Sequence, residues 1–155
     1  MIGRLRPADL VAGAGGLALL ASLFLHWYGG EVLVTGGPPL RAGSTAWQAF
    51  SVADVVLALL ALVPLALVFF QATRQSPALP VLFSVLSTLA GLIATLVIVF
   101  RLLDRPGPND EVEAGAWLGL LAALVIGAGG WRSTRDERMP GHPAPAIEHQ
   151  PAPAP

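Results

Sequence analysis

The chain alternates between four long apolar runs and shorter polar segments. The apolar runs cover about residues 9–27, 51–71, 79–101 and 114–131. A helix needs about 20 residues to cross about 30 Å of hydrocarbon at about 1.5 Å per residue. Each run is long enough to cross, the fourth only just. The pattern therefore predicts an all-α membrane protein in which four transmembrane helices form a bundle.

The segments between the runs predict how the helices connect. Ser51 and Asp54 have the spacing of a helix-capping box at the start of the second run. Only residues 72–78 separate the second and third runs. Because this connection is so short, the two helices that it joins must be antiparallel neighbours.

The first connection, residues 28–50, is the longest, and we expect it to form a short cap outside the cytoplasm. Residues 31–39 favour a short strand followed by a Gly/Pro-rich turn. Several aromatic residues lie at or near the ends of the adjoining apolar runs, namely Trp27, Tyr28, Trp47, Phe50 and Trp117. Because aromatic side chains are enriched at the level of the lipid headgroups, we expect these residues at the outer membrane boundary, with Trp47 and Phe50 along the headgroups.

The chain changes character after residue 131. Residues 132–155 are first polar and then rich in Pro and Ala, a composition that cannot bury a core. We therefore expect a disordered cytoplasmic tail over residues 132–155, attached to a transmembrane domain of residues 1–131.

The arginines predict the orientation, because the cytoplasmic flanks of membrane helices carry an excess of basic residues. One set lies in the N-terminal segment, the second connection and the tail, and comprises Arg4, Arg6, Arg74, Arg132, Arg135 and Arg138. The smaller set lies in the first and third connections, and comprises Arg41, Arg101 and Arg105. This difference predicts that both termini are cytoplasmic. The basic start, followed by an apolar run without a cleavage site, predicts a retained signal-anchor helix.

Composition narrows the classes of function. Hydrophobic residues make up 54% of the chain and charged residues 12%, unlike an ordinary soluble domain. The absence of cysteine excludes disulfides, thiolate metal sites and cysteine nucleophiles. A net charge of −1 without a basic cluster argues against nucleic acid as a partner. A single histidine in the apolar region cannot specify a metal or haem site, so we expect no cofactor.

Small residues recur at every fourth position on two of the predicted helices. Lipid provides no hydrophobic drive between helices, so small residues promote association by letting backbones approach closely. We expect these faces to contact other helices, either within the monomer, in a homo-oligomer or in a complex with another membrane protein. The two ladders are Gly115, Gly119, Ala123 and Gly127 on the fourth helix, and Ala14, Ala18 and Ser22 on the first.

His26, Asp54 and Arg101 form the candidate polar site, because the topology places all three near the outer boundary on successive helices. An Asp and a His within reach of each other can relay a proton or bind a cation. Each residue also has a structural explanation. Asp54 can cap its helix, Arg101 can extend into the headgroups and His26 lies beside boundary aromatic residues. We expect no catalytic residue and no metal ligand.

The segments Leu23–Gly29 and Ala46–Ser51, followed by Asp54, resemble small actinobacterial four-helix membrane proteins. In those proteins an aromatic-ended first helix leads through an outer loop to a Trp-x-Ala-Phe segment, with an Asp near the start of the second helix. The resemblance implies a bacterial plasma membrane and supplies no activity. The family more often has proline where His26 stands, so the resemblance does not imply a shared histidine-based mechanism.

The sequence favours a non-catalytic integral membrane protein that acts as a structural or accessory component of a membrane assembly. The small-residue ladders and the nearly uncharged apolar runs support this hypothesis. Its expected partners are the lipid bilayer and either a second copy or another membrane protein. The alternative is a small transporter or channel subunit that uses His26 and Asp54 at its outer boundary.

Overall fold

The computed structural model describes residues 7–32, 37, 40–50, 52–73, 78–105 and 111–138. Most of them are helical. The helices are α1 (Pro7–Ser22), α2 (Ala46–Ala49), α3 (Ala53–Thr73), α4 (Ala78–Leu103) and α5 (Ala114–Arg138). The strands are β1 (His26–Val32), β2 (Leu40–Thr45) and β3 (Glu111–Val112). The described part of the chain is therefore a helical protein with one small sheet.

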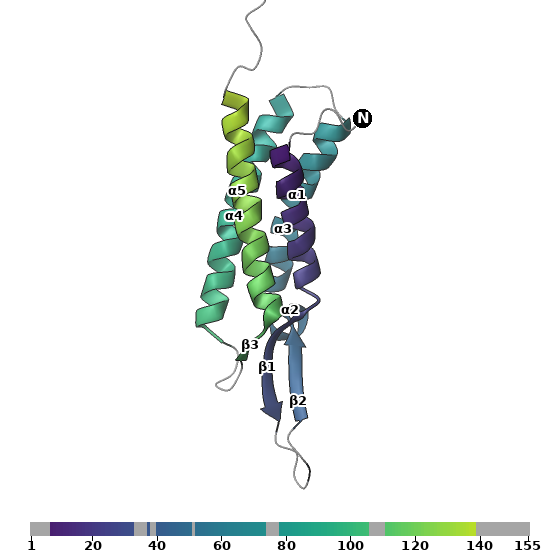
Figure 1. The fold of residues 1–155 in the computed structure, drawn as a ribbon, viewed down its shortest axis with the longest axis vertical. Coiled ribbons are helices and arrows are strands. Elements are labelled where there is room, and N and C mark those ends of the chain that lie inside the picture. The colour runs from purple at the N-terminus through teal and green to yellow at the C-terminus, as the bar shows by residue number, and fades with distance from the viewer. Residues whose placement is uncertain are drawn as a thin grey trace, which may run out of the picture.

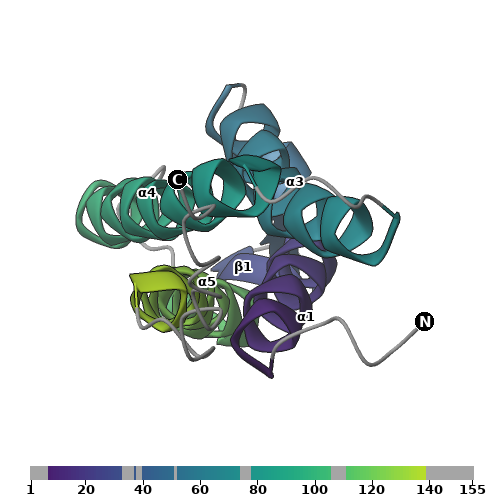
Figure 2. The same cartoon turned by 90° about the horizontal axis from the view of Figure 1, so that it is seen from above.

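The four long helices form an up-and-down bundle (Figures 1 and 2). Contacts join α1 to α3, α3 to α4, α4 to α5, and α5 back to α1, so each long helix packs against two others. Consecutive long helices run in opposite directions, as the short connection between α3 and α4 predicts (Figure 1). The start of α1 and the end of α5 therefore lie at the same end of the bundle.

Three helical segments are long and apolar enough to cross a membrane, namely Ala53–Thr73, Leu82–Leu103 and Ala114–Arg135. The apolar helix α1 is shorter. Large apolar side chains are exposed on the outer faces of these helices, among them Leu17, Leu59, Phe69, Leu96 and Leu121. Their length, composition and exposed apolar side chains indicate a membrane-embedded protein.

The first helix is shorter than the apolar pattern predicts, because α1 ends at Ser22 and His26 already lies in β1. The amides of residues 23–25 donate to carbonyl groups three or four residues earlier, which closes the last turn. The indole Nε1–H of Trp27 donates to the carbonyl oxygen of Ser22 at 2.7 Å. The last carbonyls of α1 thus find donors within an apolar segment, where hydropathy alone gives no sign of a helix end.

The last helix is longer than predicted, because α5 continues to Arg138 and residues 132–138 are not a disordered tail. Ser133 is fully buried, and its hydroxyl donates to Asp9 Oδ1 at 2.6 Å. The hydroxyl of Thr134 donates to the carbonyl oxygen of Gly130 at 2.9 Å. These bonds keep polar residues on the helix. The remainder of the predicted tail, residues 139–155, lies outside the described residues.

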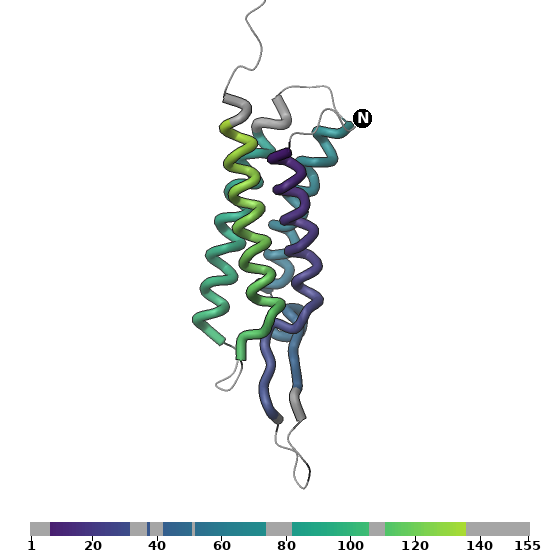
Figure 3. Tube along the Cα trace, viewed as in Figure 1, coloured from purple at the N-terminus to yellow at the C-terminus, as the bar shows by residue number. Residues whose placement is uncertain are grey.

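The cap is an antiparallel sheet with strand order β2-β1-β3. β1 and β2 extend past the bundle at the end opposite the start of α1 (Figures 1 and 3). The predicted strand overlaps β1 at residues 31–32, and the rest of it, residues 33–35, lies outside the described residues. The sheet and the short helix α2 together link α1 to α3.

Gly91 on α4 and Gly127 on α5 lie where these two helices cross. A Cβ atom added at Gly91 would overlap the backbone nitrogen of Gly127. A Cβ atom added at Gly127 would lie 3.8 Å from the nearest atoms of Gly91, an ordinary contact distance. The crossing therefore requires glycine at residue 91 and tolerates a methyl group at residue 127.

We expect Gly91→Ala to lower the midpoint of thermal unfolding in detergent. Overpacking costs about 1–3 kcal/mol, which exceeds the roughly 1 kcal/mol by which alanine favours a helix over glycine. Gly127→Ala is the matched control and should leave the midpoint unchanged or raise it. Equal effects of the two substitutions would contradict the crossing described above.

Candidate functional site at the junction of bundle and cap

Trp27 and Tyr28, near the start of β1, are the largest fully buried side chains among the described residues. The Trp27 ring lies against α5 at Gly115 and Gly119, where added Cβ atoms would lie 2.9 and 2.8 Å from ring atoms. Its indole donates to the carbonyl oxygen of Ser22 on α1. Trp27 is therefore held between α1 and α5 at the end of α1, and its side chain is fully buried.

Phe50 joins the same cluster from the other end of the first connection. It is 6% exposed, and its ring meets those of Trp27 and Tyr28 edge to face, with centroids 5.6 and 5.8 Å apart. This burial differs from the predicted position along the headgroups. The guanidinium carbon of Arg101 lies 4.8 Å from the centroid of the Phe50 ring.

The Tyr28 hydroxyl completes the link by donating to the backbone carbonyl oxygen of Arg101 at 2.6 Å. This bond reaches α4 near its last turn, where carbonyl groups lack helical partners. We refer to Trp27, Tyr28, Phe50 and Arg101 as the aromatic junction. It attaches the cap to α1, α4 and α5.

The three residues of the candidate polar site make contacts with different parts of the chain. The His26 side chain is exposed and lies against Gly43 of β2. Asp54 is 4% exposed, and its Oδ1 accepts from the amide of Val55 in the first turn of α3 at 2.7 Å. Arg101 lies over Phe50. Within the described part of the chain, no hydrogen bond or ion pair joins any two of these three residues.

A buried carboxylate lies at the opposite end of the bundle. Asp9 on α1 is fully buried and accepts the bond from Ser133 on α5. Ser84 and Ser87 on α4 are fully buried as well. Each of these polar residues lies in or next to an apolar run, but the sequence carries no sign that Asp9 and Ser133 are paired.

The small-residue ladder of α5 packs inside the bundle. Gly115 and Gly119 lie against Trp27, Ala123 is fully buried, and Gly127 lies at the crossing with Gly91. Each of these residues contacts another part of the same chain or is covered by it. This corresponds to the packing within the monomer that the sequence left as one possibility.

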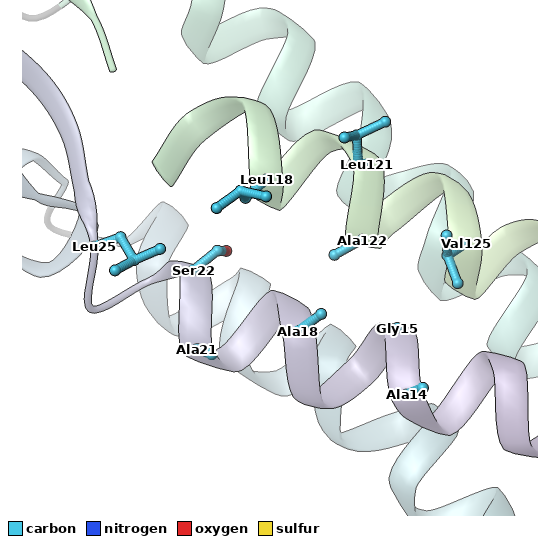
Figure 4. A pocket seen from close by; sticks show the side chains of 10 residues that line it. All are labelled: Ala14, Gly15, Ala18, Ala21, Ser22, Leu25, Leu118, Leu121, Ala122 and Val125. Atoms are coloured by element: carbon cyan, nitrogen blue, oxygen red, sulfur yellow. The ribbon is translucent and has the colours of Figure 1, made fainter. Parts of the chain in front are cut away.

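The small-residue ladder of α1 has different surroundings. Ala14 and Ala18 are exposed and Ser22 is buried, and all three line a groove of about 470 Å³ between α1 and α5 (Figure 4). The hydroxyl of Ser22 donates to the carbonyl oxygen of Leu19. The groove is lined by Ala14, Gly15, Ala18, Ala21, Ser22, Leu25, Leu118, Leu121, Ala122 and Val125. Its walls are almost entirely apolar, as expected for a surface that faces acyl chains.

No three His, Cys, Asp or Glu side chains of the described residues come together in a way that could hold a metal ion. Comparisons of the chain with family models, curated proteins and solved structures gave no match. The fold and its contacts therefore define the class: a membrane-embedded helical bundle with a small sheet attached at one end. The contacts of the aromatic junction hold that sheet against the bundle.

The Tyr28 hydroxyl should contribute measurably to this attachment. Tyr28→Phe keeps the ring and removes the bond to the partly buried carbonyl group of Arg101, which should lower stability by about 0.5–1.5 kcal/mol. Thermal unfolding in detergent and hydrogen exchange of the β1 amides would measure the change. Leu96→Val, at a side chain that is 69% exposed on α4, is the control. Unchanged stability and exchange in Tyr28→Phe would show that the bond is dispensable.

Proposed function

We propose that this protein is a non-catalytic structural or accessory component of an assembly in a bacterial plasma membrane. In this proposal the bundle crosses the bilayer four times, and it holds the cap at the outer membrane surface. The single observation that carries the proposal is the aromatic junction, in which fully buried side chains attach the cap to α1, α4 and α5. A cap attached in this way presents a constant surface to a partner.

A fourth crossing is supported by the surroundings of α1. Its 16 residues span about 24 Å at about 1.5 Å per residue, slightly less than the hydrocarbon layer. The apolar turn at Leu23–Leu25 extends this length. Because α1 packs lengthwise between α3 and α5, which are both long enough to cross, it occupies the same layer as they do.

The arginine distribution supports cytoplasmic termini in this proposal. The start of α1, the end of α3 and the end of α5 lie at the end of the bundle opposite the cap (Figure 1). Along the chain, the larger set of arginines lies in or next to these three helix ends, and the smaller set lies in or next to the elements at the cap end. The cap then lies outside the cytoplasm.

A structural role is also supported by the contacts of the charged residues near the cap. The Asp54 carboxylate accepts a backbone amide at the start of its helix, and Arg101 stacks on Phe50. Charged groups near the ends of membrane helices cost much less than those at the centre, so these contacts suffice to explain them.

Copurification tests the proposal. With an affinity tag after Pro155 and mild solubilisation of native membranes, we expect one other membrane or extracytoplasmic protein in near-stoichiometric amount. The control is the same tag on an unrelated four-helix membrane protein of similar expression.

Flux measurements test the transporter or channel alternative. Proteoliposomes that contain only this chain should show no ion flux above empty vesicles. Absence of a copurifying protein, together with a pH-dependent flux that Asp54→Asn changes without unfolding the bundle, would replace the proposal with the transporter or channel alternative.

A further inference from the structure

β2 lies at an edge of the cap sheet. Among the described strands it pairs only with β1, and β3 pairs with the other side of β1. β2 lies beyond the helical bundle, where the cap extends past the helix ends (Figure 3). An edge strand presents a row of backbone N–H and C=O groups that can pair with another extended chain.

The direction of the backbone groups follows from the bonds on the other side of the sheet. In an antiparallel strand, successive residues point their N–H and C=O groups alternately to the two sides. The carbonyl of Trp27 accepts from the amide of Glu113 at 2.9 Å, and Gly29 pairs with Glu111 of β3. Residues 27 and 29 therefore direct their backbone groups toward β3.

The alternate residues of β1, Tyr28 and Gly30, must direct their backbone groups toward β2. Tyr28 and Gly30 are paired with Ser44 and Ala42 respectively. The hydroxyl of Ser44 lies 3.5 Å from the carbonyl oxygen of Tyr28, which agrees with this direction. Ser44 and Ala42 therefore use their backbone groups for the ladder with β1.

The alternate residues of β2, Arg41 and Gly43, point their backbone groups away from β1. The next outward amide along the strand, that of Thr45, donates to Oε1 of Gln48 at 3.1 Å. The outward amide of Thr45 is thus used within the cap. The outward groups of Arg41 and Gly43 form a two-residue segment with the spacing of a strand-pairing site.

We infer that the outward edge of β2 binds an extended segment of a second protein, which adds a strand to the cap sheet through hydrogen bonds to the backbone of Arg41 and Gly43. This mode of recognition obtains its affinity from main-chain hydrogen bonds. The inference rests on the proposed function, since it names the kind of partner that the cap holds.

A second copy of this chain fits the edge less well than a different protein. β2 runs along the long axis of the bundle (Figure 1). Two copies inserted in the same direction, and related by a twofold axis along the membrane normal, would bring their β2 strands together in parallel. Parallel pairing is the less stable arrangement, and a free segment of another protein can pair antiparallel.

Two substitutions at residue 43 test the inference. Gly43→Pro removes the outward amide and keeps the ladder with β1, because the residue 43 amide is not part of that ladder. Gly43→Ala retains the amide and places the same Cβ atom against the exposed His26 ring, so it is the matched control. The probe is a photoreactive benzoylphenylalanine at the exposed residue Ala42 of the full-length chain in intact cells.

We expect a crosslink to one other protein in the wild-type background and in Gly43→Ala. In Gly43→Pro its yield should fall by roughly three- to tenfold, the loss associated with one backbone hydrogen bond. In the purified wild-type complex, exchange of the Gly43 amide should slow relative to the chain alone, while the Ala42 amide should not change. If Gly43→Pro fails to fold, the exchange of the Gly43 amide alone tests whether a partner pairs with β2.

Three results would overturn the inference. They are equal crosslinking in Gly43→Pro and Gly43→Ala, a crosslinked product with the mass of two copies of this chain, and unchanged exchange of the Gly43 amide in the complex. Recovery of a partner in the copurification experiment alongside any of these results would leave the proposed function in place. Absence of any partner in both experiments would remove the function and the inference together.

Discussion

The carbonyl groups at the end of α1 constrain the form of the whole cap. Backbone polar groups in or near hydrocarbon must find partners within the protein, because the layer has no water to supply them. α1 ends inside an apolar segment, and its last carbonyls accept from the amides of the following turn and from the Trp27 indole. The Trp27 indole thus ties the start of β1 to the last turn of α1. β1 then continues past the end of the bundle, contacts α5 and forms the central strand of the sheet (Figure 1).

The position of Trp27 in turn depends on glycine in α5. Any side chain at Gly115 or Gly119 would occupy space that the indole fills, so the two glycines and the tryptophan form one packing unit. Farther along the same helix, Gly127 meets Gly91 of α4. The small-residue ladder of α5 therefore contacts two different neighbours, the Trp27 side chain of the cap and the backbone of α4. Ala14 and Ala18 of α1 repeat at the same spacing and yet lie in an apolar groove.

The lengths of the apolar runs predicted the long helices, because the length needed to cross a membrane is a property of a single segment. α3 and α4 begin and end within two residues of their predicted bounds for this reason. The burial of Trp27 and Phe50 and the pairing of Asp9 with Ser133 depend on residues from different segments. Ser133 follows the apolar run and has neighbours typical of a tail, so its place in the bundle could not be predicted from local composition. The helix ends, the cap contacts and the buried polar pair were missed for the same physical reason.

The same physical reason explains why the sequence favours His26, Asp54 and Arg101 as a polar site. Ionisable side chains near a membrane boundary are visible in a sequence, but here Asp54 accepts a backbone amide and Arg101 lies on an aromatic ring, so two of the three take part in structural contacts. The outward groups of β2 belong to the backbone, and every residue except proline carries them. Gly43 and Arg41 differ from other residues of the strand only in the side of the sheet to which their amides point. That property follows from strand order and register, so it can be found only after the chain has folded.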